Sequence, residues 1–279
     1  MGEHKSLLYQ DQWRFIDQSG FAPHFNALDS FAIDDTLCQS VGSGNSPPVV
    51  RTWVHDDTVV LGIQDTKLPH LEEGLRYLQE KNIKWIVRNS GGLAVLLDEG
   101  VLNISLIIPD TERGIDINRG YDAMWELVKM MFNEYSCRIE TGEIVGSYCP
   151  GSYDLSIRGK KFAGISQRRI RNGVAVQVYL CVSGSGSKRA QLLQEFYTHA
   201  KFNESMKYTF PAVEPSVMAS LSELLNHRLT VTDAMQLLLT TLKRTSGQLF
   251  MSSLQGKELE WYPHYFERMQ DRNKKFMGA

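Results

Sequence analysis

Residues 159–182 read GKKFAGISQRRIRNGVAVQVYLCV and carry the strongest local structural signal in the chain. Two runs of strand-like composition, 161–170 and 174–182, stand on either side of Arg171-Asn172-Gly173. Asn-Gly between two such runs is the strongest short-range signal for an antiparallel hairpin. The sequence therefore predicts two adjacent antiparallel strands at this point.

The segments around this hairpin alternate between strand and helix patterns. Further strands are expected at 13–16, 49–55, 58–62, 83–87, 93–97, 101–108, 139–145 and 153–157, with a turn at Asp56-Asp57 between the second and third of these. Helices are expected over about 23–39, 68–82, 120–135 and 188–199, and then near 215–226, 231–245 and 256–275. Many strands, mostly antiparallel, with segregated helices predict an α+β fold. We expect a catalytic domain over 1–210 and a helical segment without strands, 211–279, packed on the same domain.

The composition is that of an ordinary globular protein, with 42% hydrophobic and 22% charged residues among 279. The 30 Lys and Arg residues do not outnumber the 32 Asp and Glu residues, so nucleic acid and membrane surfaces are not expected partners. No stretch approaches the roughly 18 apolar residues of a membrane-spanning helix. The four cysteines and seven histidines show no disulfide-like or metal-binding spacing. A reduced, cytoplasmic protein without a metal site is expected.

The first candidate for chemistry is the segment Arg88-Asn89-Ser90-Gly91-Gly92. A predicted strand leads into two glycines, which allow backbone N–H groups to approach a ligand closely. Arg88 has the charge to bind an anion or a carbonyl oxygen. The alternative is a strained turn that needs glycine for its backbone angles alone.

The second candidate is Cys149, in the loop Gly146-Ser-Tyr-Cys-Pro-Gly-Ser152. A loop thiol is more accessible than a strand thiol, and a reactive cysteine needs access to its substrate. The alternative is a half-buried structural cysteine. We interpret Cys38, Cys137 and Cys181 as packing residues.

The third candidate is Lys161, which follows Lys160 in the first strand of the hairpin. Side chains alternate along a strand, so Lys161 shares its face with Ala163 and Ile165 and points toward the core. A buried ammonium is costly unless it has a partner, such as a substrate carbonyl or a thiol. The alternative is a solvated pair of lysines at a turn.

These three segments, in this order, resemble the lipoate/biotin protein ligase superfamily. Residues 88–95, RNSGGLAV, are similar to its R-x-x-G-G-x-x-V lipoate loop, and residues 159–164, GKKFAG, to its G-x-K-x-x-G strand. The resemblance covers residues 13–210 and implies a biotin protein ligase-like domain with a mixed sheet backed by helices. The residues that it implies as substrate-binding are Arg88, Ser90, Gly91, Gly92, Asn103 and Gly164.

Two details place the chain within this superfamily. The ATP-dependent ligases usually show R-R-x-S-G-G-G-A-V-x-H, whereas this chain has Asn89, Leu93 and Leu97 at three of those positions. The departures speak against adenylate formation, and no cofactor is expected. A cysteine twelve residues before the lysine, as in Cys149 and Lys161, is the mark of the cysteine-dependent octanoyltransferases.

Within that branch, RNSGGLAV at 88–95 and DEGVLN at 98–103 resemble enzymes that take octanoate from the glycine-cleavage H protein. The resemblance implies transfer to E2 lipoyl domains of oxoacid dehydrogenases, through a thioester on Cys149. Lys161 is expected to stabilise the thiolate and the oxyanion. Three alternatives stay open: transfer from acyl carrier protein to H protein, an ATP-dependent lipoate ligase, and a non-catalytic lipoyl-domain binding protein.

Overall fold

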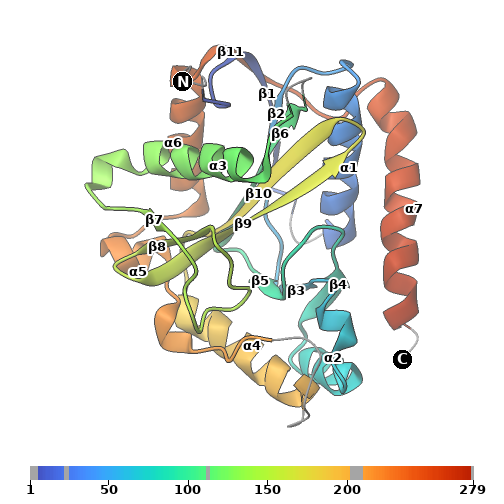
Figure 1. Ribbon diagram of the computed structural model, residues 1–279, viewed down its shortest axis with the longest axis vertical. Coiled ribbons are helices and arrows are strands. Elements are labelled where there is room, and N and C mark those ends of the chain that lie inside the picture. The colour runs from blue at the N-terminus through green and yellow to red at the C-terminus, as the bar shows by residue number, and fades with distance from the viewer. Residues whose placement is uncertain (1–5, 22–24, 111–113, 202–209, 278–279) are drawn as a thin grey trace.

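The computed structural model describes residues 6–21, 25–110, 114–201 and 210–277. These residues form an eight-stranded sheet, a smaller three-stranded sheet and helices that cover both (Figure 1). The strands are β1 (Gln10–Gln18), β2 (Val49–Trp53), β3 (Thr58–Leu61), β4 (Lys84–Val87), β5 (Val95–Leu97), β6 (Val101–Pro109), β7 (Glu140–Thr141), β8 (Asp154–Ile157), β9 (Lys160–Ile170), β10 (Gly173–Cys181) and β11 (Ser246–Met251). The α+β class expected from the sequence is confirmed.

The large sheet has the order β11-β1-β2-β6-β10-β9-β8-β7. β1 pairs in parallel with β11 and with β2, and every other pair in this sheet is antiparallel. The predicted hairpin is confirmed as β9 and β10, with Gly173 opposite Ile170. Arg171 and Asn172 both have positive φ, 49° and 61°, which is the backbone of the tight turns that suit the twist of paired strands.

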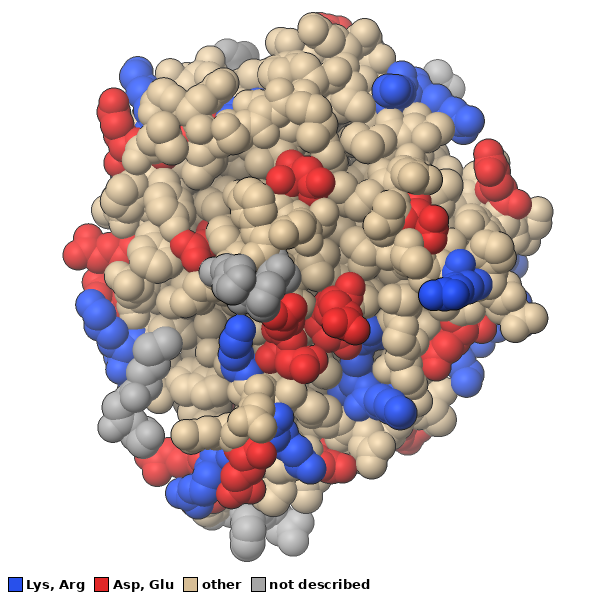
Figure 2. Space-filling model, turned by 180° about the vertical axis from the view of Figure 1, so that it is seen from behind, with Lys and Arg blue, Asp and Glu red and all other residues tan. Residues whose placement is uncertain are grey.

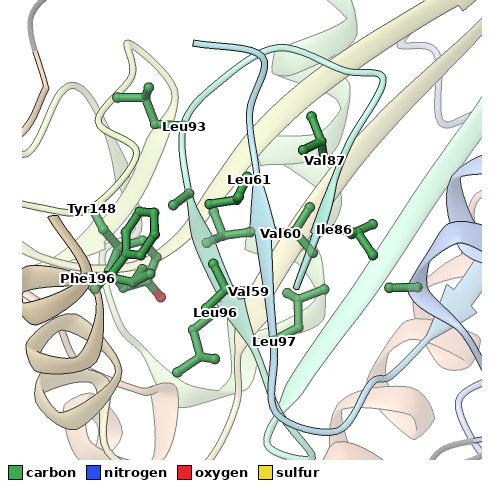
Figure 3. Packing of buried hydrophobic residues seen from close by; sticks show 14 of the residues in the cluster. Val59, Val60, Leu61, Ile86, Val87, Leu93, Leu96, Leu97, Tyr148 and Phe196 are labelled. Atoms are coloured by element: carbon green, nitrogen blue, oxygen red, sulfur yellow. The ribbon is translucent and has the colours of Figure 1, made fainter. Parts of the chain in front are cut away.

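The small sheet has the order β4-β3-β5, with β4 parallel and β5 antiparallel to β3. The expected turn at Asp56-Asp57 therefore joins two sheets and not two paired strands. The reason is that β1 and β6 already occupy both edges of β2. Apolar side chains of all three small-sheet strands form one cluster, which also includes Tyr148 and Phe196 (Figure 3).

The helices lie in three groups around the sheets (Figure 1). Their bounds are α1 (Ala27–Gly42), α2 (Leu71–Glu80), α3 (Ile117–Met131), α4 (Gly186–Lys201), α5 (Leu221–Leu225), α6 (Val231–Arg244) and α7 (Lys257–Met277), with short 3-10 turns η1 (Asp65–Lys67), η2 (Asn133–Tyr135) and η3 (Pro215–Val217). α1 packs against α7 on one side of the large sheet, and α3 packs against α6 on the other. α2 and α4 pack together beside the small sheet. Asn26 caps α1, so this helix begins after the expected start at residue 23, which lies outside the described residues.

The segment after residue 210 differs from the expectation of helices alone. β11 lies within it and forms the outer strand of the large sheet beside β1. Three of its six residues, Gly247, Gln248 and Met251, are exposed and none is buried, so the segment lacks the apolar alternation that marks a strand in a sequence. The segment packs on the same body as the residues before it: β11 extends the sheet, and α6 and α7 contact α3 and α1.

The face turned away from the viewer in Figure 1 carries charges of both signs. Lys and Arg side chains are scattered among Asp and Glu, and several acidic side chains gather near the middle of this face (Figure 2). Within the described residues, no helix combines the length and the apolar character needed to cross a membrane.

Candidate active site

A cavity of about 230 Å³ lies between the two sheets. β9 and β10 supply Gly164 and Val178 on one side, and the small sheet supplies Val60 and Val95 on the other. Six of the eight site residues predicted from the sequence line this cavity, namely Arg88, Gly91, Gly92, Asn103, Cys149 and Gly164. Segments far apart in the chain therefore converge on one site.

Much of the cavity wall is apolar. Phe31 of α1, Trp53 at the end of β2 and Leu97 of β5 join the valines of the two sheets. Sequence reasoning missed these residues because each follows an ordinary core pattern. A pocket of this kind suits an apolar chain with one polar end, since apolar surface provides the affinity and a few polar groups provide the orientation.

Cys149 lies in the loop before β8 and is partly exposed to the cavity. Its φ is +46°, a left-handed conformation that non-glycine residues seldom adopt and that concentrates at functional sites. The backbone N–H of Leu93 donates to Cys149 Sγ at 3.1 Å. Arg88 Nη2 lies 3.6 Å from the same sulfur atom. The thiol thus meets one N–H donor and one cation.

The loop between β4 and β5 brings Arg88 to this thiol. The Arg88 side chain is 6% exposed, and Nη2 also donates to the Leu93 carbonyl at 2.8 Å. Among the described residues no carboxylate forms an ion pair with Arg88, and its Nε is buried without a hydrogen-bond partner. A buried cation without a paired anion is costly, so the site is electrostatically prepared for a thiolate or an oxyanion.

Gly92 makes this approach possible. Its φ is +98°, and a Cβ added there would lie 2.4 Å from Arg88 Nη2 and 2.9 Å from Cys149 Sγ. The neighbouring Gly91 has open space around it. Of the two glycines in the motif, Gly92 is therefore the one whose missing side chain lets cation and thiol meet.

Lys161 is fully buried, as the strand alternation predicts, while Lys160 is exposed. The Lys161 ammonium lies 2.8 Å from Asp154 Oδ1 and donates to the carbonyl oxygens of Tyr148 and Cys149, both at 2.9 Å. Lys161 does not line the cavity, and its contact with Cys149 is to the backbone and not to the thiol. The sequence expectation placed this cation beside the thiol, where the structure places Arg88.

Asp154 is the partner of Lys161 that the sequence did not single out. Its other oxygen, Oδ2, accepts from the backbone of Ile144 and from the Ser147 hydroxyl, so the pair holds the cysteine loop at several points. Burial raises the pKa of the Asp154 carboxyl, and the charge of Lys161 opposes that rise.

A second buried network holds the Leu93 side of the site. The Tyr197 hydroxyl donates to Asp65 Oδ1 at 2.8 Å and accepts from the backbone of Ala94 at 3.2 Å. Asp65 Oδ2 accepts from the backbone of Gly62 at 2.7 Å. Burial raises the pKa of Asp65 to about 6. This network orients the backbone next to Leu93, whose N–H meets the thiol.

Two predicted substrate-binding residues, Asn103 and Ser90, lie at the edge of the site. Asn103 donates to the Trp53 carbonyl at 3.2 Å at the cavity wall, and Ser90 is buried outside the cavity with its hydroxyl unpartnered.

Cys38 and Cys181 are buried and Cys137 is half-buried, all three outside the cavity. Within the described ranges no cluster of three or more His, Cys, Asp or Glu residues could hold a metal ion.

The sequence matches a known protein family. Residues 26–243 fit the Lipoyl protein ligase A/B catalytic domain. The chain belongs to this family. The match includes the Arg88 loop, Cys149 and Lys161, so the residues that form the cavity all lie within the family domain.

Similar proteins match this chain over almost its full length. A protein of Anoxybacillus flavithermus named octanoyl-[GcvH]:protein N-octanoyltransferase is 59% identical over 96% of this chain and 97% of its own length. A Geobacillus kaustophilus protein of the same name is 56% identical over 96% and 95%. A Listeria monocytogenes protein named lipoyl-[GcvH]:protein N-lipoyltransferase is 50% identical over 99% and 100%.

Solved structures show the same fold. The structure of Ta0514 of T. acidophilum, a putative lipoate protein ligase with bound lipoic acid, has a TM-score of 0.69 and 18% identity over 93% of this chain and 95% of that chain. A structure from an archaeal lipoylation system, described as a bi-partite lipoate protein ligase and its E2 lipoyl domain from Thermoplasma acidophilum, has a TM-score of 0.68 and 17% identity over 95% of this chain and 96% of that chain. The predicted lipoate ligase-like architecture is confirmed.

Proposed function

We propose that the protein transfers an octanoyl group from the lysine of glycine-cleavage H protein to the lysine of E2 lipoyl domains, through a thioester on Cys149. The observation that carries this proposal is the thiol that lines a largely apolar cavity and is contacted by the Leu93 N–H and by Arg88. The names of relatives that are 50–59% identical support an H protein as donor.

In the first half of the reaction, the Cys149 thiolate attacks the carbonyl carbon of the octanoyl amide on H protein. The new C–S bond forms and the C–N bond breaks, so the acyl group becomes a thioester. The departing lysine amine takes up a proton. The alkyl chain occupies the apolar cavity between the sheets.

In the second half, the lysine amine of an E2 domain attacks the thioester carbon. The C–N bond forms, the C–S bond breaks and the thiolate returns, while the acceptor amine releases one proton. One amide is exchanged for another, so the overall free-energy change is near zero and the reaction needs no nucleotide. The thioester lies above both amides, and little acyl-enzyme accumulates unless the free donor is removed.

Two groups have the position to stabilise charge on the reacting atoms. The Leu93 N–H and the Arg88 guanidinium both contact the sulfur atom that attacks the carbonyl, so both stabilise the thiolate. We assign the same two donors to the oxyanion that forms next to this sulfur atom. One donor of this kind is typically worth about 10²–10³ in rate. We assign Gly91, Gly92, Asn103 and Gly164 to the wall that holds the acyl group.

Lys161 and Ser90 take indirect roles in this proposal. Lys161 is a positioning residue, because its ammonium holds the Cys149 carbonyl and pairs with Asp154. Ser90 lies buried in the loop that presents Arg88. Both support the geometry of the thiol site from outside the cavity.

The test is intact-mass spectrometry of an apo E2 lipoyl domain incubated with this protein and octanoyl-H protein, without ATP. We expect the E2 domain to gain one octanoyl group, and the Cys149→Ala variant to give no gain. Cys137→Ala is the matched control, since Cys137 lies outside the cavity. Full transfer by Cys149→Ala would overturn the thioester route.

Two further arms separate the alternatives. Octanoyl-acyl carrier protein in place of octanoyl-H protein tests the carrier-dependent reaction, and free lipoate with ATP tests the ligase reaction. A parallel incubation with lipoyl-H protein compares the two acyl groups that appear in the names of the relatives. The proposal requires that octanoyl-H protein be the better donor.

A further inference from the structure

A buried amide of the C-terminal helix contacts the strand that leads into Arg88. Asn273 of α7 is 0% exposed. Its Oδ1 accepts from the backbone N–H of Val87 at 2.7 Å, and its Nδ2 donates to the Val87 carbonyl at 3.0 Å. The same Nδ2 also donates to the Met269 carbonyl at 2.9 Å within α7. The two residues lie 186 positions apart in the chain.

This contact completes an otherwise open strand edge. β4 is an outer strand of the small sheet and pairs with β3 alone. The Asn273 amide binds the N–H and C=O of Val87 together, as a neighbouring strand would. On the other side, the next backbone N–H, that of Arg88, donates to the Leu61 carbonyl of β3 at 2.9 Å. The backbone is therefore held from both sides where the Arg88 side chain leaves it.

We propose that Asn273 is a positioning residue that aims the Arg88 guanidinium at the Cys149 thiol. This inference rests on the function proposed above. The chain of contacts is short: Asn273 binds Val87, Val87 is bonded to Arg88, and Arg88 Nη2 lies 3.6 Å from Cys149 Sγ. It makes α7 part of the active-site support.

Other contacts already attach α7 to the body of the protein. Tyr262 donates to Asp29 and Tyr265 donates to Gln39, both in α1. Glu258 at the start of α7 pairs with the buried Arg14 of β1. These contacts anchor the helix without involving β4. The double hydrogen bond of Asn273 is thus directed at the Arg88 segment in particular.

The test measures the rate at which iodoacetamide alkylates Cys149 as a function of pH, followed by peptide mass spectrometry. Asn273→Leu keeps the approximate side-chain size and removes the hydrogen bonds. We expect alkylation at neutral pH to slow by about two- to thirtyfold, the range seen for side chains that modulate a site without touching it. The slowing is expected because the thiolate loses the aligned cation.

A double-mutant cycle decides whether the effect passes through Arg88. In an Arg88→Gln background, Asn273→Leu should leave the alkylation profile unchanged. Tyr265→Phe is the matched control, because it removes one hydrogen bond of α7 to α1 and none to β4. It should leave the profile at its wild-type position.

An unchanged alkylation profile in folded Asn273→Leu would overturn the proposal. A slowing of alkylation by Asn273→Leu that persists in the Arg88→Gln background would also overturn it. If the Leu variant does not fold, Asn273→Ala provides the same comparison, since it also removes both hydrogen bonds to Val87 and adds no charge. Alkylation needs no acyl substrate, so its outcome is independent of the transfer assay. If octanoyl transfer fails while Asn273→Leu slows alkylation in an Arg88-dependent way, only the proposed function is rejected.

Discussion

The backbone nitrogen of Leu93 lies 3.1 Å from Cys149 Sγ, although the two residues are 56 positions apart in the chain. This contact joins the glycine loop after β4 to the cysteine loop before β8. It means that the two loops form one site, and that a change in either loop alters the surroundings of the same sulfur atom.

Removal of the Arg88 charge should destabilise the Cys149 thiolate and slow the reaction. We expect Arg88→Gln to lower the rate of octanoyl transfer by about 10²–10³-fold, the effect of losing one oxyanion donor. Arg88→Lys should recover little, because the lysine side chain is shorter and its ammonium does not reach the position from which Arg88 Nη2 contacts both the Leu93 carbonyl and the thiol. The measurement is the initial rate of transfer by intact-mass spectrometry. Arg169→Gln, which alters a partly exposed arginine paired with Asp110, is the control. Equal rates for Arg88→Gln and Arg169→Gln would contradict the role of Arg88.

The two glycines of the loop should respond differently to alanine. Gly92→Ala introduces a Cβ at 2.4 Å from Arg88 Nη2 on a backbone with φ of +98°, so the guanidinium must move away from the thiol. We expect at least a hundredfold loss of transfer rate, since misplacement of about 1 Å has this cost. Gly91→Ala meets open space and should lose far less. Similar losses in the two variants would show that the close approach at Gly92 has no special role.

Lys161 should matter for stability as well as activity. Lys161→Met leaves the Asp154 carboxylate buried without its cation, and breaking a buried pair in this way typically costs about 3–5 kcal/mol. Urea unfolding should show this loss of unfolding free energy. The second substitution Asp154→Leu in the same chain should restore part of it. Lys274→Met removes an exposed ion pair with Asp271 and should leave stability near wild type. A stable Lys161→Met protein would contradict the structural role of this pair.

Asp65 should impose a measurable pH dependence on stability. Burial raises the pKa of its carboxyl from 3.8 to about 6, so between these values the folded protein holds a proton that the unfolded chain has released. Its contribution to the free energy of unfolding therefore falls as the pH rises through this window, by about 3 kcal/mol in total. Asp65→Asn lacks this titration. Urea unfolding at pH 4 and pH 7 should show the wild type losing stability relative to Asp65→Asn as the pH rises. A pH-independent difference between the two proteins would contradict the raised pKa.

Local patterns in the chain are sufficient for several features. The β9–β10 hairpin is indicated by Asn172-Gly173, although the two turn residues are Arg171 and Asn172, and Gly173 is the first residue of β10, opposite Ile170. The burial of Lys161 follows from strand alternation, which has a fixed period of two. The motif residues around Arg88 and Cys149 identify the segments of the site, since each segment is continuous in the sequence.

The tertiary structure alone settles which groups meet. The sequence expectation put Lys161 beside the Cys149 thiol, whereas packing places Lys161 on Asp154 and Arg88 at the sulfur atom. β11 joins the large sheet and Asn273 reaches Val87 because distant segments pack side by side. Such contacts depend on how elements pack in three dimensions. Spacing along the chain records local periodicity, and it holds no information about which of two distant side chains reaches a given atom first.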